Sequence, residues 1–163
     1  MIEDYISAIQ DTEPFCLKAV FDVSRERAEK VATDLHVDAY FDQSGIQMSL
    51  KALFGRQDVQ AVIITMPLEQ QVETIQQALD AGINVLSENP ISQNVEHARR
   101  LIEWYTDQYE GDSLWSVSEN LRFSDPILYA YHQVQKLEGR IVAFSIRVTR
   151  KIASDELIWF GID

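Results

Sequence analysis

Apolar residues follow two alternating spacings along this 163-residue chain. Mostly apolar runs of strand length occupy residues 15–21, 39–41, 59–65, 83–87 and 114–117. Runs of this kind are typical of strands that are buried on both faces of a parallel sheet. Cys16 falls inside the first run, so we expect its thiol to pack in the interior rather than to act as a nucleophile.

The segments between these runs repeat apolar residues at the helical spacing. Helices are predicted over residues 2–10, 50–54, 70–81, 94–108 and 126–137, and over a segment through Leu35 that Ser24 caps. Gly55 and Gly82 are expected to end the helices that precede them, because glycine readily adopts the conformations found just past a helix end. The stripe predicted to face inwards on the helix at 94–108 comprises Val95, Ala98, Leu101, Ile102 and Tyr105.

Alternating buried strands and amphipathic helices predict an α/β fold with a doubly wound parallel sheet. Residues 141–149 differ, because apolar residues there alternate with smaller or polar ones. That alternation predicts a strand with one exposed face. We therefore expect the chain to enter a second, α+β domain after a boundary between Ser124 and Gly139.

The chain carries 26 Asp and Glu residues against 14 Lys and Arg residues, which gives a formal net charge of −12. Neutralising the phosphates of a nucleic acid requires clustered cations, so this balance argues against nucleic-acid partners. An anionic cofactor remains compatible, since helix N-termini bind phosphate through backbone N–H groups. The three histidines lack the spacing of metal ligands, and no metal site is expected.

Cys16 is the only cysteine, which rules out an internal disulfide and fits a reducing compartment. No stretch reaches the roughly 20 apolar residues that cross a bilayer. Met1 is followed closely by Glu3 and Asp4 rather than by a basic and then an apolar region, so no secretory signal is expected. We expect a cytoplasmic protein without membrane contact.

Four stretches of this sequence resemble the Gfo/Idh/MocA family of nicotinamide-dependent oxidoreductases. They are LKAVFDVSRERAEKVA (17–32), DVQAVIITMP (58–67), QALDAGINVLSENP (77–90) and WSVSENLRF (115–123). The second is similar to the family's strand followed by Thr-Pro, and the third to its AGKHVLxEKP signature. The order and spacing match as well, and the resemblance runs from about residue 2 to residue 149.

The resemblance implies an N-terminal Rossmann domain that binds NAD or NADP and transfers hydride to or from a carbinol, imine or similar carbon. The substrate would be a small polar metabolite held against a C-terminal open sheet. On this basis residues 1–123 are a partial Rossmann-like dinucleotide-binding domain, and residues 124–163 are the beginning of the C-terminal substrate domain.

The sequence departs from the family pattern in three places. The chain begins at the helix that would follow the first strand and the glycine-rich phosphate loop, and no two of its six glycines have G-x-G spacing. Asn89 stands in place of the signature lysine, which the resemblance assigns to substrate proton transfer, and an amide cannot carry a titrating proton. The chain also ends shortly after the expected first strand of the substrate domain. We expect a chain truncated at both ends, without a standard grip on pyrophosphate.

The expected sheet is an incomplete doubly wound (Rossmann-like) sheet that lacks its first strand. In the strand order 3-2-1-4-5-6 that strand is central, here between residues 15–21 and 59–65. The flanking strands would expose unpaired backbone groups, at a cost of about 1–3 kcal/mol for each group that is buried unsatisfied. The two strands could pair directly, or an upstream segment or another chain could supply the missing strand. Exposed apolar edges favour association, and we expect a homo-oligomer (a dimer) or a partner chain that covers them.

Candidate cofactor-binding residues lie where strands end, because ligands bind at the carboxyl edge of such sheets. They are Asp22, Thr65, Pro67, Glu88 and Asn89. Asp22 is placed to bond the adenosine ribose, with a surface Asp before a helix as the alternative. Thr65 and Pro67 also fit a strand that a proline ends, and Glu88 and Asn89 also fit a turn before a proline. No catalytic residue is assigned.

Other residues near these strand ends have simple structural interpretations. Ser24 fits a helix cap. Arg25 could meet a 2′-phosphate but also fits a solvated helix residue, and Asn120 and Arg122 could line the same crevice or lie in a loop. The leading hypothesis is an NAD(P)-dependent oxidoreductase of a small metabolite. The alternative is a non-redox small-molecule binder, an accessory subunit or a cofactor-independent isomerase or cyclase, and an inert remnant comes third.

Overall fold

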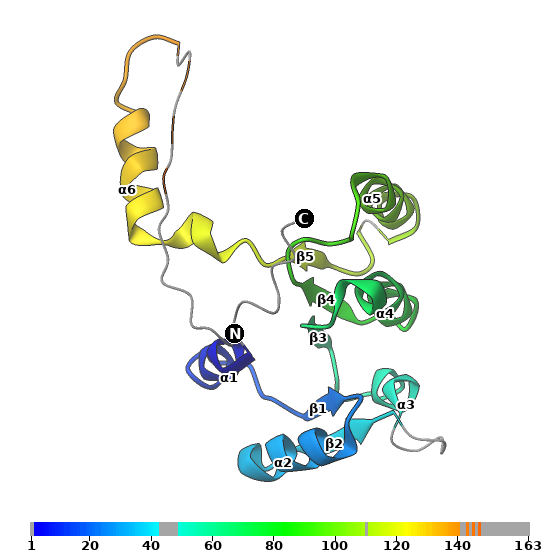
Figure 1. The fold of residues 1–163 in the computed structure, drawn as a ribbon. Coiled ribbons are helices and arrows are strands. Elements are labelled where there is room, and N and C mark those ends of the chain that lie inside the picture. Colours follow the sequence, from blue (N-terminus) through cyan, green and yellow to red (C-terminus); the bar gives the residue numbers. More distant parts are fainter. Residues whose placement is uncertain are drawn as a thin grey trace. The chain divides into compact units, whose positions relative to one another are not determined.

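The computed structural model describes residues 2–42, 49–109 and 111–140, together with Ala143, Ser145 and Arg147. The chain divides into two compact units, the first ending at Asn120 and the second beginning at Leu121. Most of the strand predicted at 141–149 lies outside the described residues. Figure 1 traces the elements of both units in chain order.

The first unit alternates helices and strands in the predicted order. Figure 1 shows α3, α4 and α5 together on one side of the strands and α1 on the other. The helices are α1 (Ile2–Gln10), α2 (Arg25–Leu35), α3 (Leu50–Phe54), α4 (Leu68–Asp80) and α5 (Val95–Tyr109), and the strands are β1 (Ala19–Asp22), β2 (Asp38–Phe41), β3 (Ala61–Ile64), β4 (Asn84–Ser87) and β5 (Trp115–Val117). The predicted α/β fold is confirmed.

Side-chain caps and left-handed residues set several helix ends. Ser24 Oγ accepts from the Arg27 N–H at 3.5 Å and begins α2, as the sequence predicts. Asn94 Oδ1 accepts from the His97 N–H at 2.9 Å and begins α5. Gly82 has a φ of 74° just past the end of α4, a conformation that favours glycine. Local chemistry therefore fixes these boundaries.

The strands form two separate parallel sheets, β1-β2 and β3-β4-β5. Val20 lies opposite Ala39 in the first sheet, and Val62 lies opposite Val85 in the second. β1 and β3 are the two strands predicted to flank the central position of the complete strand order, and they do not pair with each other. The prediction of an incomplete doubly wound sheet is confirmed, and direct pairing of its two flanking strands does not occur.

The core of the first unit lies where α4 packs on β3 and β4. Ile75 and Leu79 of α4 are completely or almost completely buried, as the helical spacing predicts. They contact a cluster that includes Ile64, Val85 and Leu101. Phe21 of β1 packs against the same cluster, so the two sheets share one core.

The strands are shorter and less buried than the sequence predicts. Residues 15–18 precede β1 rather than belonging to it, Phe15 is 66% exposed, and Cys16 is exposed. In β3, Ala61 is exposed and Ile63 is 37% exposed. The expectation of full burial was wrong for both strands, because each of them has a neighbouring strand on one side only.

The buried stripe of α5 differs from the predicted one in two positions. Val95 and Ile102 are exposed, whereas Leu101 is buried and Trp104 and Tyr105 are half-buried. Leu101, Trp104 and Tyr105 are three and four residues apart and therefore share one helix face. Ile102 is rotated away from that face by its place next to Leu101, so the predicted stripe was too wide.

The second unit contains one described α-helix, α6 (Asp125–Val134), with a proline in its first turn. The sequence predicts this helix over 126–137, so it ends earlier than expected. A 3₁₀ turn over Asn120–Phe123, which the sequence pattern does not predict, comes before it. Apolar side chains on the described part of this unit are exposed, namely Leu121, Phe123, Leu128, Tyr129, Tyr131, Val134 and Leu137.

Candidate functional site

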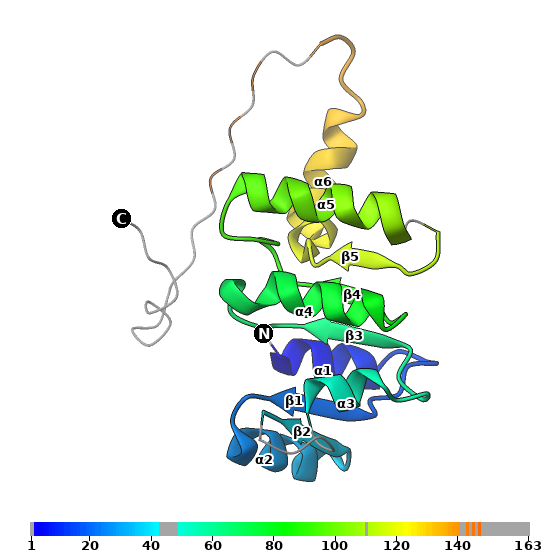
Figure 2. The same ribbon diagram turned by 90° about the vertical axis from the view of Figure 1, so that its right-hand side faces the viewer.

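Three polar side chains follow the carboxyl ends of the three-stranded sheet. Thr65 comes directly after β3, Glu88 directly after β4 and Ser118 directly after β5. Parallel strands end at a common edge, so these residues lie at the same edge of the sheet. Asp22 is the last residue of β1, and Figure 2 shows the arrows of β1 and β3 pointing to the same side. The two sheets therefore present one carboxyl edge, and this edge is the candidate site.

Asp22 is held in an ion pair on this edge. Both carboxylate oxygens accept from Arg27 Nε at 3.1 Å, and Oδ1 also accepts from Arg27 Nη2 at 2.9 Å. The Ser24 N–H donates to Oδ1 at 2.7 Å. Desolvation raises the pKa of Asp22, but the bonds from Arg27 and Ser24 outweigh it, so the pKa lies below its ordinary value. Asp22 is therefore an anion at neutral pH, and a ribose hydroxyl would compete with Arg27 for it.

Tyr5 of α1 reaches the carboxyl edge and bridges the ends of β4 and β5. Its hydroxyl donates to Glu88 Oε1 at 2.7 Å, and its oxygen lies 2.6 Å from Ser118 Oγ. A carboxylate can only accept, so Ser118 is the donor in the second bond. Desolvation is the largest cause of a raised pKa for Tyr5; the Ser118 bond lowers the pKa and the Glu88 carboxylate raises it. The neutral phenol thus serves as the donor that positions Glu88.

Gln71 of α4 holds the backbone of the turn that carries Glu88 and Asn89. Its side chain is fully buried, and Nε2 donates to the carbonyls of Glu88 at 3.2 Å and Pro90 at 2.8 Å. The Glu88 N–H donates to the Ile64 carbonyl at 3.3 Å, and the peptide bond between Asn89 and Pro90 is cis. The turn is thereby fixed from two directions. Gln71 Oε1 has no partner among the described residues.

The other predicted site residues are placed at the same edge without polar contacts that define a role. Thr65, Pro67 and Asn89 are exposed, and Pro67 occupies the N-cap position of α4. The structure thus brings Thr65, Glu88 and Asn89 to adjacent strand ends. Asp22 ends a strand of the other sheet.

Local structure accounts for the residues around the site that the sequence left open. Arg25 Nε donates to Glu29 Oε1 at 2.7 Å, and the Arg25 guanidinium lies 5.3 Å from the centre of the Phe41 ring. Asn120 ends the first unit and Arg122 belongs to the second, and both side chains are exposed.

The sequence pattern does not single out Tyr5, Gln71 or Ser118. Tyr5 lies on the apolar face of its predicted helix, where a phenol is read as a packing group. Gln71 is four residues before Ile75, so it shares the buried face of α4, and that placement was the one available signal. Ser118 follows a strand end, but its partner on α1 is 113 residues away in sequence.

A cavity of about 330 Å³ opens beside Asp22. Its walls include Phe21 and Val23, which flank Asp22 in sequence, and Met66, which follows β3 by two residues. Residues of α3 and α4 complete the lining. An apolar wall next to an anionic carboxylate suits a ligand that has a flat apolar part and hydroxyl groups.

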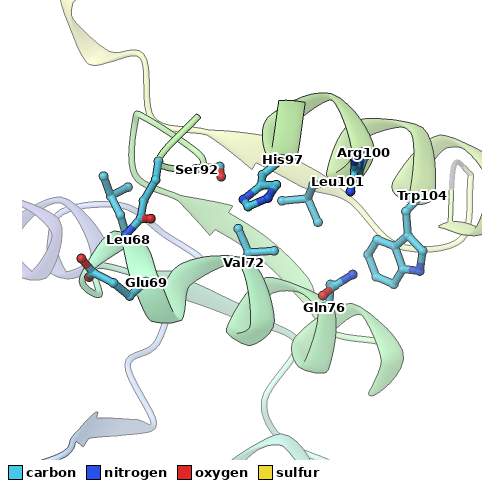
Figure 3. A pocket seen from close by; sticks show the side chains of 10 residues that line it. Leu68, Glu69, Val72, Gln76, Ser92, His97, Arg100, Leu101 and Trp104 are labelled. Carbon is cyan, nitrogen blue, oxygen red and sulfur yellow. The ribbon is translucent and has the colours of Figure 1, made fainter. Parts of the chain in front are cut away.

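A second and larger cavity of about 570 Å³ lies between α4 and α5. Figure 3 shows Val72 and Leu101 facing each other across it, with His97 near one end and Trp104 near the other. Arg100, also on its lining, pairs with Glu96 at 3.1 Å. None of the predicted site residues lines this cavity.

The described glycines do not provide a phosphate cradle at the carboxyl edge. Gly55 and Gly82 follow helices and precede β3 and β4, and Gly111 precedes β5, so all three lie towards the opposite edge of the sheet. Gly139 belongs to the second unit. The residues described here therefore fit the ribose and nicotinamide ends of a dinucleotide, and they do not fit its pyrophosphate.

Two further searches concern membranes and metals. No helix in the described part of the chain has the length and apolar character that crossing a bilayer requires. No cluster of three or more His, Cys, Asp or Glu side chains able to hold a metal ion occurs among the described residues.

Known proteins resemble this chain in both sequence and structure. A dehydrogenase of Fusarium mangiferae, FPY6, is 35% identical over 147 residues, which cover 88% of this chain and 42% of that protein. An uncharacterized oxidoreductase of Schizosaccharomyces pombe is 25% identical over 120 residues, or 73% of this chain and 32% of that protein. The chain therefore spans less than half the length of these relatives.

Solved structures share the fold. The scyllo-inositol dehydrogenase of Lactobacillus casei with bound NAD(H) and scyllo-inositol has a TM-score of 0.70 at 21% identity, covering 82% of this chain and 37% of that one. A probable dehydrogenase of Thermotoga maritima has a TM-score of 0.63 at 24% identity, covering 74% and 34%.

The family described as "Oxidoreductase family, NAD-binding Rossmann fold" matches residues 1–109, and this is the Gfo/Idh/MocA family. The match covers α1 to α5 and every described strand except β5. Together with the Fusarium relative, it settles the classification. The chain belongs to the Gfo/Idh/MocA family of oxidoreductases.

Proposed function

We propose that this chain forms the nucleotide-binding part of an NAD(P)-dependent oxidoreductase that transfers hydride to or from a small polar metabolite. The observation that carries the proposal is the common carboxyl edge, where Asp22, Thr65 and Glu88 end parallel strands. Ligands of doubly wound sheets bind at this edge. Membership of the oxidoreductase family supports the same function. The non-redox alternatives have no comparable support, since the matched relatives are named as a dehydrogenase and an oxidoreductase.

Asp22 is the proposed partner of the adenosine ribose. Its carboxylate is ionised at neutral pH and stands beside the cavity walled by Phe21, Val23 and Met66, which would accept the adenine ring. Binding would require Arg27 to share or release the carboxylate, because Arg27 occupies both of its oxygens. An anion here disfavours a 2′-phosphate, so we propose NAD rather than NADP as the better ligand.

Glu88, Asn89, Thr65 and Pro67 are the proposed contacts at the nicotinamide end. The bound nicotinamide supplies or accepts the hydride. Tyr5 and Gln71 hold the Glu88 side chain and the backbone of its turn, so this part of the site is fixed before a ligand binds. The Asn89 amide can donate and accept hydrogen bonds but cannot transfer a proton, so another residue of the protein must supply the acid or base.

Two further parts of the proposal concern the setting of the protein. We propose a cytoplasmic location, on the strength of the single cysteine and the acidic composition. We also propose association through the open strand edges of the first unit, since such edges favour pairing. Size-exclusion chromatography with light scattering tests the association, and a monomer at all concentrations would contradict it.

Saturation-transfer NMR with NADH tests the assignment of Asp22. We expect the signals of the adenosine ribose protons to fall strongly in Asp22→Ala, because that variant loses the carboxylate. Asp58→Ala is the matched control: Asp58 is also exposed and also paired with an arginine, Arg56, but it precedes β3 and lies towards the opposite edge. Equal ribose signals in wild type and Asp22→Ala would overturn the assignment.

A further inference from the structure

β1 and β3 each form backbone ladders on one side only. The Asp38 N–H donates to the Lys18 carbonyl at 3.2 Å, which places the even-numbered residues of β1 in the ladder with β2. The N–H and C=O groups of Ala19 and Phe21 therefore point to the other edge of β1. They have no backbone partner among the described residues.

The same reasoning applies to β3. The Asn84 N–H donates to the Gln60 carbonyl at 3.1 Å, and the Glu88 N–H donates to the Ile64 carbonyl at 3.3 Å. The even-numbered residues of β3 therefore pair with β4, and the N–H and C=O groups of Ala61 and Ile63 point away from it. Each strand thus offers an unused row of donors and acceptors.

We propose that the space between β1 and β3 binds an extended apolar strand of a separate polypeptide, running parallel to both. The two free rows require a partner with backbone donors and acceptors on both of its sides. Only an extended strand has them, because a helix uses its backbone groups internally. The inserted strand would join the two sheets into one.

Direction and composition follow from the neighbouring strands. β1 and β3 point the same way (Figure 2), and every ladder described in both sheets is parallel, so a parallel strand continues the pattern. Phe21 and Val62 pack against the core on one face of the sheets, and the exposed Ile63 side chain of β3 alternates to the other face. A strand between them would have apolar neighbours on both faces, so its own residues should be apolar throughout.

Cys16 makes the direction measurable. Its thiol is exposed and lies three residues before β1, at the amino end of the proposed site. The probes are two synthetic peptides, each with the apolar segment Val-Ile-Val-Ile-Val between lysines, carrying a cysteine at the N-terminus in one and at the C-terminus in the other. Parallel insertion brings only the N-terminal cysteine near Cys16. We expect its mixed disulfide to form at least about tenfold faster, through the raised effective concentration.

Two controls complete the disulfide experiment. A peptide of the same composition with proline in place of the central residues lacks the donors that β1 and β3 require, and it should lose the directional preference. Cys16→Ser should form no mixed disulfide. Equal rates for the two peptides, or a faster reaction of the C-terminal cysteine, would overturn the proposal.

Amide hydrogen exchange reads the same site without modification. The Phe21 and Ile63 amides should exchange quickly in the free chain and slow at least about tenfold when the peptide is added, since they gain partners. The Val20 and Val62 amides, which their ladders direct towards β2 and β4, should be slow throughout. Protection of Phe21 and Ile63 in the free chain, by a second copy or by each other, would contradict the proposal. The readout involves no dinucleotide, so it stands or falls separately from the proposed function.

Discussion

The Tyr5 hydroxyl donates to Glu88 Oε1 at 2.7 Å, although the two residues are 83 positions apart in sequence. This bond fastens the first helix to the end of the central strand of the β3-β4-β5 sheet. Ser118 completes the contact from the end of β5. The carboxyl edge is thus ordered by residues from three elements, and the orientation of Glu88 depends on a residue outside the sheet.

Tyr5→Phe should weaken this connection. The variant keeps the ring and removes the donor to a partly buried carboxylate, so we expect a loss of about 1–2 kcal/mol in the free energy of unfolding. Urea unfolding followed by circular dichroism measures it. Tyr129→Phe, at an exposed position in the second unit, is the control and should change stability by less than about 0.5 kcal/mol. A Tyr5→Phe protein as stable as the wild type would show that the bond has no weight.

Arg27→Met should raise the pKa of Asp22 above its value in the wild type. Desolvation raises this pKa, and in the variant only the Ser24 N–H would still oppose it. In the wild type the lowered pKa stabilises the fold above the ordinary value of 3.8, and the stabilisation is lost as the pH falls through the folded-state pKa. Carboxyl-carbon NMR measures the titration. Arg25→Met, which removes the partner of Glu29 instead, should leave Asp22 unchanged.

Gln71→Leu should destabilise the turn that follows β4. The leucine fills similar volume but cannot donate to the carbonyls of Glu88 and Pro90, and a cost of about 1–3 kcal/mol follows for buried acceptors that lose their partner. Chemical denaturation is the measurement. The exposed Gln77, on the same helix, gives the control variant Gln77→Leu, for which we expect little change. Equal effects at the two positions would contradict the role given to Gln71.

Local chemistry explains how much of this fold the sequence predicts. Ser24 begins α2 and Gly82 follows α4 because a hydroxyl cap and a positive φ are properties of single residues. The alternation of strands and helices depends on spacing within short windows, and it was confirmed.

Burial and long-range contacts depend on neighbours that the sequence does not name. Cys16 and Ile63 look like interior residues, yet they are exposed because β1 and β3 pair on one side only. The candidate edge was predicted from strand ends, which placed Asp22 and Glu88. Tyr5 and Gln71 were not predicted, because each acts through a partner brought close only by the tertiary fold.

The most direct measurement is an amide chemical-shift map of the chain titrated with NADH to millimolar concentrations. The account predicts shifts at Val23, Thr65 and Asn89, with Gln60 and Asn84 at the opposite edge unmoved. It also predicts a dissociation constant weaker than about 1 mM, since the described residues offer no phosphate cradle. Shifts confined to other surfaces, or tight binding with a dissociation constant in the micromolar range, would contradict it.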